Sequence, residues 1–303
     1  MGILITGANG LTGHAILRQL QGKTDVVRCL TSNQNSADSL LRLGATEVVV
    51  GNLADEESVF RAATGMTRVL HIPPRMKPEE TQYGKNVIHA AKRAGVQCIY
   101  LHSVINSQVS AIQFHVHKRL VEEAAITSGV PWVIFQPTNF MQNVSWNWAK
   151  LNSDGEFLFP YSATQEVSWL DLDDYAQAVA KCLTESGWEY GIYECVSTKA
   201  PLSRVQLAQI WSKVLQRSIK ATTMPLDDYM RLPHWQGRDP REMAILRTMF
   251  QEFDNHGAPG GNSRTLAMML GRDTTSYEQF AEKFFLQASA CAIQGRSIER
   301  NAS

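Results

Sequence analysis

Residues 3–13 read Ile-Leu-Ile-Thr-Gly-Ala-Asn-Gly-Leu-Thr-Gly, a short apolar run followed by three glycines that are three residues apart. The apolar run predicts a buried strand, and the glycines predict a tight turn into a helix that begins near Leu11. Gly7 permits the turn, Gly10 leaves the backbone open to a pyrophosphate, and Gly13 lets the helix pack close to the strand. The N–H groups and the dipole of such a helix attract phosphate. The stretch therefore predicts a dinucleotide site; the alternative is a purely structural turn.

The composition is that of a globular protein with balanced charge. The chain has 303 residues, 44% of them hydrophobic and 19% charged, and its 29 basic side chains equal its 29 acidic ones. This balance gives no electrostatic reason to expect nucleic acid or a membrane as a partner. The five cysteines are scattered and odd in number, which predicts reduced thiols and a cytoplasmic protein. We expect a small apolar molecule as the partner, and a monomer or homodimer.

Strand and helix patterns alternate through the first half of the chain. Apolar runs predict strands at residues 3–6, 26–30, 47–50, 68–72, 98–102 and 132–136. Helical spacing of apolar residues predicts helices at 11–20, 35–43, 56–64, 80–94 and 117–128. Repeated strand–helix–strand units form a parallel sheet with helices on both faces. The chain is therefore predicted to have an α/β fold with a Rossmann doubly wound parallel sheet.

The pattern changes after Pro137. The sequence there predicts a helix or loop at 139–152 and strands at 167–169 and 192–196. It also predicts helices at 171–185 and 202–215 and a break at 257–262. Asp171 is the candidate N-cap of the first of those two helices. We expect a Rossmann domain at 1–137 whose core is re-entered at about 165–200. A smaller, mostly helical C-terminal substrate lobe is expected at 138–164 and 201–295, and a frayed tail at 296–303.

Five segments of the chain resemble the NmrA-like group of atypical short-chain dehydrogenases. The first three are the glycine turn within residues 6–13, an Asn-Leu-Ala-Asp segment within 50–55 and a His-Ile-Pro-Pro segment at 71–74. The other two are a Pro-Thr-Asn-Phe-Met-Gln-Asn stretch within 135–143 and a Leu-Gly-Arg-Asp-Thr-Thr element within 270–277. The resemblance spans nearly the whole chain and implies a Rossmann fold that binds a nicotinamide dinucleotide. The group contains reductases and redox-sensing regulators, so the resemblance alone does not define a reaction.

The resemblance implies that the nicotinamide lies near Ser103, at the end of the fifth strand, and near Lys118 on the following helix. An ammonium at Lys118 can hydrogen-bond the ribose hydroxyls, hold the ring and lower the pKa of a neighbouring donor. Ser103 and Lys118 are therefore expected to be catalytic. The alternative for Lys118 is an ordinary surface lysine.

Phe114 stands four residues before Lys118, where ordinary short-chain dehydrogenases have a tyrosine that protonates the carbonyl oxygen. Phenylalanine has no proton to give, which argues against simple ketones and for an enone, a quinone or an iminium as hydride acceptor. Water, Lys118 or a histidine would supply any proton, and His117 is the candidate histidine. His115 and His117 are two residues apart and point in different directions on a helix, so we expect no metal site.

The loop after the second strand predicts the choice of cofactor. NAD-dependent proteins usually place an acid there, whereas residues 31–35 read Thr-Ser-Asn-Gln-Asn. Ser32 stands where the NmrA-like group commonly has an arginine, so the usual phosphate clamp is missing as well. Ser32 and Asn33 can donate hydrogen bonds, and Arg28 lies just before them. We therefore expect NADP(H), with NAD(H) as the alternative.

The other expected contacts follow from the resemblance and from the position of each segment in the fold. The residues expected to bind the cofactor are Thr6, Gly7, Asn9, Gly10, Leu11, Thr12, Gly13, Ser32, Asn33, Asn52, Leu53, Pro73, Pro74, Ser103, Lys118, Pro137 and Asn139. Large apolar side chains suggest a substrate wall formed by Phe114, Phe140, Met141, Trp146 and Trp169. The alternative for the Trp and Met side chains is ordinary core packing.

These features predict an NAD(P)H-dependent oxidoreductase, an atypical short-chain dehydrogenase that lacks the usual tyrosine and transfers hydride to a small apolar acceptor. Two other functions remain open. The missing tyrosine also fits a redox-neutral isomerase or cyclase on the same scaffold. A non-catalytic protein that senses NAD(P) and regulates a partner is the second alternative.

Overall fold

The computed structural model describes residues 1–293, so the predicted frayed tail at 296–303 lies outside the described residues. The chain divides into two compact units. The first unit comprises Met1–Ser110, Phe114–Pro137 and Tyr175–Glu194. The second comprises Ala111–Gln113, Thr138–Asp174 and the chain from Cys195 onward.

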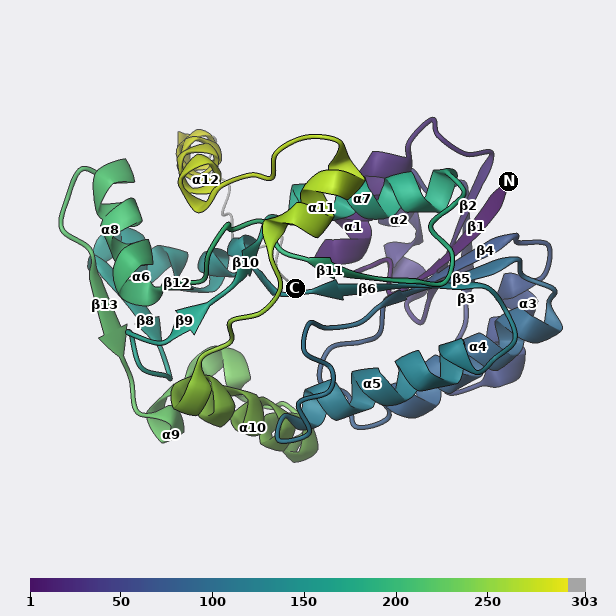
Figure 1. Ribbon diagram of the computed structural model, residues 1–303, viewed down its shortest axis with the longest axis horizontal. Coiled ribbons are helices and arrows are strands. Elements are labelled where there is room, and N and C mark those ends of the chain that lie inside the picture. Colours follow the sequence, from purple (N-terminus) through teal and green to yellow (C-terminus); the bar gives the residue numbers. More distant parts are fainter. Residues whose placement is uncertain (294–303) are drawn as a thin grey trace. The chain divides into compact units, whose positions relative to one another are not determined.

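A seven-stranded sheet forms the centre of the first unit (Figure 1). Its strands are β1 (Gly2–Thr6), β2 (Val26–Thr31), β3 (Glu47–Val50), β4 (Arg68–His71), β5 (Cys98–His102), β6 (Trp132–Pro137) and β11 (Gly191–Cys195). Their order is β11-β6-β5-β4-β1-β2-β3, and all neighbours from β3 to β6 are parallel. The predicted Rossmann sheet is therefore confirmed. The order reverses between β1 and β4, and open α/β sheets bind ligands at the carboxyl ends of the strands at such a point.

Helices cover both faces of this sheet (Figure 1). On one face lie α3 (Glu56–Ala63), α4 (Glu80–Arg93) and α5 (Gln113–Ile126), and on the other lie α1 (Leu11–Leu20), α2 (Ala37–Arg42) and α7 (Leu172–Thr184). A short 3-10 turn, η1 (Gln34–Ser36), precedes α2. Buried aliphatic side chains of the strands and of α3, α4 and α5 form one continuous core. Burial of this apolar surface is the main stabilising contribution to the unit.

Helix α5 begins four residues before the predicted start at 117. Its first turn is fixed by a tertiary contact, because Nδ1 of the buried His115 lies 2.8 Å from the carbonyl oxygen of Asn106. The local sequence pattern contains no sign of this hydrogen bond. As a result Phe114 lies inside the helix, one turn before Lys118 on the same face.

The second unit consists of short strands and helices. Its strands are β7 (Asn139–Phe140), β8 (Glu156–Phe159), β9 (Glu166–Val167), β10 (Trp169–Leu170), β12 (Leu202–Ser203) and β13 (Lys220–Thr223). Its helical elements are η2 (Met141–Asn147), α6 (Trp148–Ser153), α8 (Arg204–Val214), α9 (Leu226–Tyr229), η3 (Pro233–Trp235), α10 (Pro240–His256), α11 (Ser263–Leu270) and α12 (Tyr277–Ile293). The strands pair as β7 with β10, β8 with β13 and β9 with β12.

Two of the expected elements in this unit differ in detail. The single strand predicted at 167–169 is wrong, because the chain forms β9 and β10 with different partners and Ser168 N between them donates to the Ala258 carbonyl. The helix predicted at 202–215 begins at Arg204, where Ser203 and Gln206 form a capping box. The predicted cap at Asp171 is confirmed, since its Oδ1 accepts the N–H groups of Asp173 and Asp174 at 3.0 Å each.

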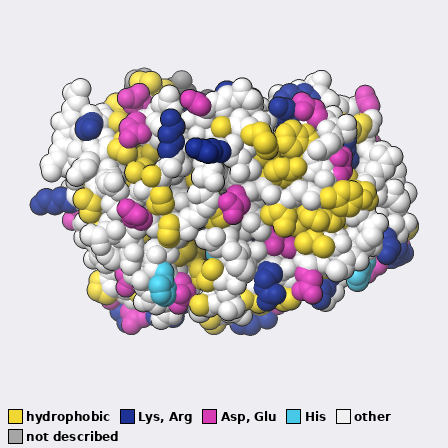
Figure 2. Space-filling view, in the orientation of Figure 1, with side chains coloured by type: hydrophobic (Ala, Val, Ile, Leu, Met, Phe, Trp, Pro, Cys, Tyr) yellow, Lys and Arg dark blue, Asp and Glu magenta, His cyan; other side chains and the backbone are white. Residues whose placement is uncertain are grey.

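Three further features of the molecule bear on function. All five cysteines are free. Among the residues that the structure describes, no helix is long and apolar enough to cross a membrane. Figure 2 shows acidic and basic side chains interspersed on one face of the molecule, as the equal numbers of the two kinds would predict.

Candidate functional site

Two glycines of the turn after β1 are required by the fold itself. Gly7 has a φ of +68°, and a Cβ there would lie 2.2 Å from the carbonyl oxygen of Ile72. A Cβ on Gly13 would lie 2.6 Å from Cα of Ala8, so the helix packs directly against the turn. Neither position has room for a side chain.

Gly10 is different, because the surrounding protein leaves room for a side chain there. Its φ is −81°, and the nearest atom to a Cβ would be the Gly7 carbonyl oxygen at an ordinary contact distance of 3.6 Å. Gly10 is exposed at the start of α1, where no side chain caps the helix and the first turn holds no acid. An approaching anion could reach the backbone N–H groups of this helix start. The turn therefore fits a pyrophosphate.

The loop after β2 is held by its own polar contacts. Asn9 Nδ2 donates to Thr31 Oγ1 at 2.6 Å, which joins the glycine turn to this loop. Asn33 Oδ1 accepts from Asn35 N at 3.0 Å and caps η1. Ser32 and Asn33 are both exposed. The loop thus presents neutral donors and no acid to a ribose or a 2′-phosphate.

Arg28 does not serve this loop, contrary to the expectation from its position in the sequence. Its Nε donates to Glu47 Oε2 at 2.6 Å, and NH1 donates at 2.8 Å to the carbonyl oxygens of Ala62 and Thr64. Arg28 pairs with Leu4 in the middle of β1, away from the carboxyl ends of the strands. Its guanidinium is therefore already bound where no cofactor phosphate would lie.

A neutral histidine lies at the carboxyl end of β4. Thr6 Oγ1 and His71 Nδ1 share a hydrogen bond of 2.7 Å, and both side chains are buried. Burial, and then the charge of Lys118, lower the pKa of His71 to about 3. His71 Nε2 has no hydrogen-bond partner among the residues that the structure describes. His71 was not predicted from the sequence as a polar group of the candidate site, although a histidine that ends an apolar strand is a usable signal.

A second neutral histidine ends β5. His102 Nδ1 and the hydroxyl of Tyr175, on α7, lie 2.7 Å apart. Burial holds the pKa of His102 well below its usual range, and the charge of Lys118 acts in the same direction. His102 was also missed, because the strand pattern Cys-Ile-Tyr-Leu-His reads as core.

Ser103 follows β5 as expected, and its hydroxyl is engaged with a buried acid. Ser103 Oγ donates to Glu122 Oε1, Ser107 Oγ donates to Glu122 Oε2 at 2.8 Å, and Gln136 Nε2 donates to Oε1 at 2.8 Å. The proton of Ser103 is therefore committed to Glu122, while its oxygen can still accept a hydrogen bond. Neither Glu122 nor Gln136 was anticipated.

Lys118 is buried, which excludes the surface-lysine alternative. Its side chain is 4% exposed, and Nζ lies 3.0 Å from Oε1 of Glu80, a fully buried glutamate at the start of α4. Nζ also donates to the His102 carbonyl oxygen at 3.4 Å and lies 5.1 Å from the centre of the Phe114 ring. Burial lowers the pKa of Lys118 and raises that of Glu80, and the attraction between the two opposes both shifts.

The remaining expected residues of the first unit lie at or near these strand ends. Leu11, Thr12, Pro73, Pro74 and His117 are half-buried, and Pro137 is buried at the end of β6. Asn52 is exposed, and its Oδ1 accepts from Ala54 N at 3.0 Å. The side chain of Leu53 packs against the core beneath α3 and α4. Within residues 1–291, no cluster of His, Cys, Asp or Glu is suited to a metal ion.

The expected substrate residues of the second unit differ in exposure. Met141 is fully buried, and Trp169 is 3% exposed with its ring 5.7 Å from that of Tyr277. Phe140 and Asn139 are half-buried in β7, whereas Trp146 is 38% exposed. Met141 and Trp169 therefore pack in the core of their own unit, and Phe140 and Trp146 have the more accessible side chains.

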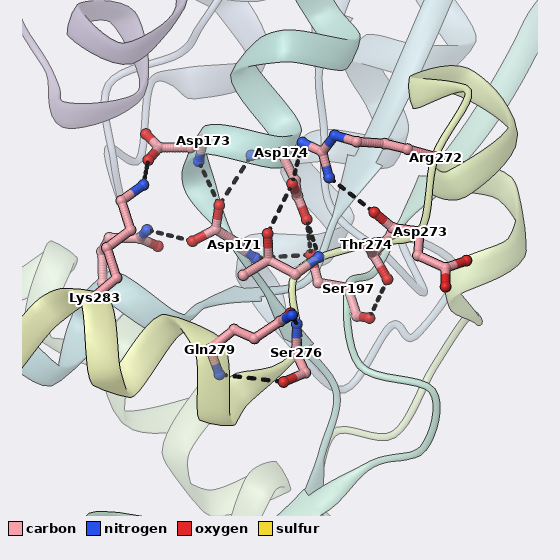
Figure 3. A network of polar contacts seen from close by, with 12 residues as sticks. Asp171, Asp173, Asp174, Ser197, Arg272, Asp273, Thr274, Ser276, Gln279 and Lys283 are labelled. Carbon is pink, nitrogen blue, oxygen red and sulfur yellow. Dashed lines mark hydrogen bonds and ion pairs between the residues drawn. The ribbon is translucent and has the colours of Figure 1, made fainter. Parts of the chain in front are cut away.

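The Leu-Gly-Arg-Asp-Thr-Thr element has a structural partner in the second unit. Asp174 is buried and accepts hydrogen bonds from Arg272, from Thr275 N and Oγ1, and from Ser197 Oγ, while Thr274 Oγ1 donates to the Ser197 carbonyl (Figure 3). This network fastens residues 272–275 to Asp174 and Ser197 of the same unit. The motif thus has a structural role here, apart from any ligand.

The family is decided by a match along nearly the whole chain. The model of the NmrA-like family matches residues 1–282. The chain belongs to the NmrA-like family. This agrees with the resemblance seen in the five sequence segments and with the Rossmann sheet of the first unit.

Several proteins that are similar to this chain are named as reductases or oxidoreductases. NAD(P)H azoreductase of Xenophilus azovorans is 25% identical over 92% of this chain and 96% of its own length. Quinone oxidoreductase 2 of Escherichia coli is 24% identical over 93% and 98%. The crystal structure of Citrobacter sp. triphenylmethane reductase complexed with NADP(H) has a TM-score of 0.81 and 22% identity, and the match covers 94% of this chain and 99% of that one.

Proposed function

We propose that this NmrA-like protein is an NADPH-dependent reductase of small apolar acceptors that are activated toward hydride: enones, quinones or iminium compounds. The observation that carries the proposal is the placement of Lys118 and Phe114. A buried ammonium stands at the end of β5, and the side chain one turn before it has no hydroxyl. A site of this kind can bind a nicotinamide ribose but has no tyrosine acid for an ordinary ketone.

The relatives support an activated acceptor. Their names refer to azo compounds, quinones and triphenylmethanes, which are conjugated molecules in which added charge is spread over several atoms. Such acceptors need less help from an acid than an isolated carbonyl does. The acceptor class of this chain is part of the proposal, as are a cytoplasmic location and a monomeric or homodimeric state.

Four features of the first unit have a role in the proposed reaction: the start of α1, the loop after β2, Lys118 and His117. NADPH, when bound, supplies the hydride and its two electrons. The open start of α1 binds the pyrophosphate, and the loop with Ser32 and Asn33 donates to the 2′-phosphate without repelling it. Lys118 donates to the ribose hydroxyls and, with an enone or a quinone, stabilises the negative charge that develops on the acceptor oxygen. His117, half-buried beside it in the sequence, remains the predicted proton donor.

The reaction is tested by following NADPH absorbance with a panel of quinones, enones and iminium dyes, and with simple ketones as the comparison. We expect NADPH consumption with activated acceptors and little with ketones. A Lys118→Ala variant should bind NADPH more weakly and turn over more slowly. The matched control is Lys150→Ala, a lysine with 42% of its side chain exposed that pairs with Asp154 and Glu156. Wild-type activity in Lys118→Ala would remove Lys118 from the site.

The same assay separates the two alternatives. A product of unchanged mass, formed without consumption of NADPH, would indicate the redox-neutral isomerase or cyclase. Tight NADPH binding with no product from any acceptor, together with a protein partner whose binding depends on the nucleotide, would indicate the regulatory protein. Either result would replace the reductase proposal.

A further inference from the structure

Glu80 and Lys118 form an ion pair that is shut away from solvent. Glu80 is 0% exposed and Lys118 is 4% exposed, and 3.0 Å separates the ammonium from the nearer carboxylate oxygen. A buried charge without a partner is strongly destabilising, so each member of the pair stabilises the buried charge of the other. The pair joins the first turn of α4 to the second turn of α5.

The carboxylate of Glu80 depends on this one contact. In the described part of the chain it has no other ion-pair or hydrogen-bond partner. Glu80 is the first residue of the 14-residue helix α4, whose N-cap makes no side-chain hydrogen bond, and the positive end of a helix favours a carboxylate. Both effects keep Glu80 charged against the cost of its burial.

The other groups that face the pair do not replace Glu80. On β4 and β5, His71 and His102 are kept neutral, because burial and the charge of Lys118 both lower their pKa values. On α5, Glu122 lies one turn beyond Lys118, and its charge raises the pKa of that lysine. Its oxygens, however, accept from Ser103, Ser107 and Gln136. His117, also on α5, favours the charged form of Glu80.

We propose that Glu80 is a positioning residue for Lys118: it holds Nζ at the carboxyl end of β5 and keeps it an ammonium, the form in which it donates to the cofactor ribose. This inference rests on the proposed role of Lys118 in cofactor binding. Glu80 touches neither cofactor nor acceptor in this scheme. It acts through the lysine, so its effect should depend on pH.

The expected effect has a definite sign. Burial pushes Lys118 toward the neutral amine, and Glu80 is the first of the groups that oppose this shift. In Glu80→Gln the opposing charge is gone, so Lys118 loses its proton at a lower pH than in the wild type. An opposite charge at this separation moves a pKa by about 1–3 units. Binding that requires the ammonium should therefore fail at a lower pH by about that amount.

The test is a titration of NADPH binding by fluorescence across the pH range in which the folded protein is stable. For Glu80→Gln, we expect the loss of affinity at high pH to begin about 1–3 units lower than in the wild type. A Glu80→Gln/Lys118→Arg double variant should lose this pH dependence, because a guanidinium stays charged throughout. The control is Glu57→Gln, which removes a half-exposed acid paired with Arg93. Its curve should match the wild type.

A purely structural role would weaken binding equally at every pH. A folded Glu80→Gln protein with the wild-type pH curve would therefore overturn the inference. If that variant does not fold, Glu80→Asp keeps the charge and withdraws it by one methylene, and it should show a smaller shift of the same sign. A superimposable curve for Glu80→Asp would then overturn the inference. A shifted binding curve without reduction of any acceptor would refute the proposed reaction and leave the role of Glu80 intact, whereas a wild-type protein that does not bind NADPH would refute both.

Discussion

Gly7, Gly10 and Gly13 stand in one turn, yet they are glycines for different physical reasons. A side chain at Gly7 or Gly13 would collide with the backbone of the protein, at 2.2 Å and 2.6 Å respectively. At Gly10 the fold tolerates a side chain, and the space it would occupy is the approach to the start of α1. Gly7 and Gly13 are therefore required by the fold, whereas a requirement for glycine at position 10 would come from a bound ligand.

A Gly10→Val variant should therefore fold and bind the cofactor more weakly. We expect the NADPH dissociation constant to rise roughly tenfold or more, comparable to losing a hydrogen bond to a charged group of about 1.5 kcal/mol or more. Fluorescence titration measures this change. The free energy of unfolding, obtained from urea denaturation, should stay within about 1 kcal/mol of the wild-type value.

Gly13→Ala is the matched control, because it should lower the stability of the fold, which Gly10→Val should leave nearly unchanged. Its Cβ would press against Ala8, so the free energy of unfolding should fall by about 1–3 kcal/mol, the usual cost of overpacking. A Gly10→Val protein with wild-type NADPH affinity would show that the turn does not bind the pyrophosphate.

Ser32 offers a test of cofactor choice. It is exposed, and no acid stands in its loop. In Ser32→Asp, a new negative charge near the 2′-phosphate should weaken NADPH binding relative to NADH by roughly fivefold or more, which corresponds to about 1 kcal/mol of repulsion in water. Ser32→Asn, a neutral change, should leave the ratio of the two affinities unaltered. A wild-type protein that binds NADH much more tightly than NADPH would contradict the prediction.

Single residues of the candidate site were predictable from the sequence only where a motif marks them. The glycines carry a spacing, and Lys118 and Ser103 occupy positions that the resemblance supplies. Glu80 and Glu122 carry no such mark, because their roles arise from the packing of α4 and α5 against the strand ends. The state of His71 likewise depends on burial, which local sequence does not report.

Elements were predictable where the hydrophobic pattern is strong. The ranges expected for β3, β5 and α1 agree with the observed bounds, since each carries a clear apolar run or helical spacing. The start of α5 was misplaced because it depends on the hydrogen bond between His115 and Asn106. Strands β9 and β10 have two residues each, too few to show a period of their own.

Asp174 holds the segment 272–275 within the second unit, and the strength of this attachment can be measured. In Asp174→Asn, the donors of Arg272, Thr275 and Ser197 lose a buried charged acceptor. We expect the free energy of unfolding to fall by about 2–3 kcal/mol, within the range for hydrogen bonds to a charged group. Urea denaturation gives this value.

Asp173 provides the control for that variant. Its carboxylate pairs with Lys283, and the two side chains are 55% and 54% exposed. Asp173→Asn should change the free energy of unfolding by less than about 1 kcal/mol, because exposed pairs contribute little. Equal losses in the two variants would show that burial of Asp174 does not set the strength of the attachment.

Across the whole molecule, the Rossmann sheet was predictable because six of its strands follow one another with helices between them. The last strand, β11, joins the edge of the sheet after the chain has passed through part of the second unit. The second unit gives weaker signals, because its strand pairs are short and its core is formed by aromatic rings such as Trp148, Trp211 and Phe284. The sequence pattern of such rings fits a packed core as well as a ligand wall, so the expected substrate contacts were the least determined part of the prediction.

The proposed site implies a particular distribution of protection when the cofactor binds. Nearly all of the predicted NADPH contacts belong to the first unit, and Asn139 in β7 is the exception. Saturating NADPH should therefore slow amide hydrogen exchange most in residues 6–13, 71–74 and 102–118, because exchange there requires the local structure to open and the bound state resists opening. Peptides from α10 (Pro240–His256), which contain no predicted contact, serve as the internal control and should exchange at the same rate with and without the cofactor. Hydrogen-exchange mass spectrometry measures both sets in one experiment. Protection strongest in α10, with residues 6–13 unchanged, would place the nucleotide outside the glycine turn.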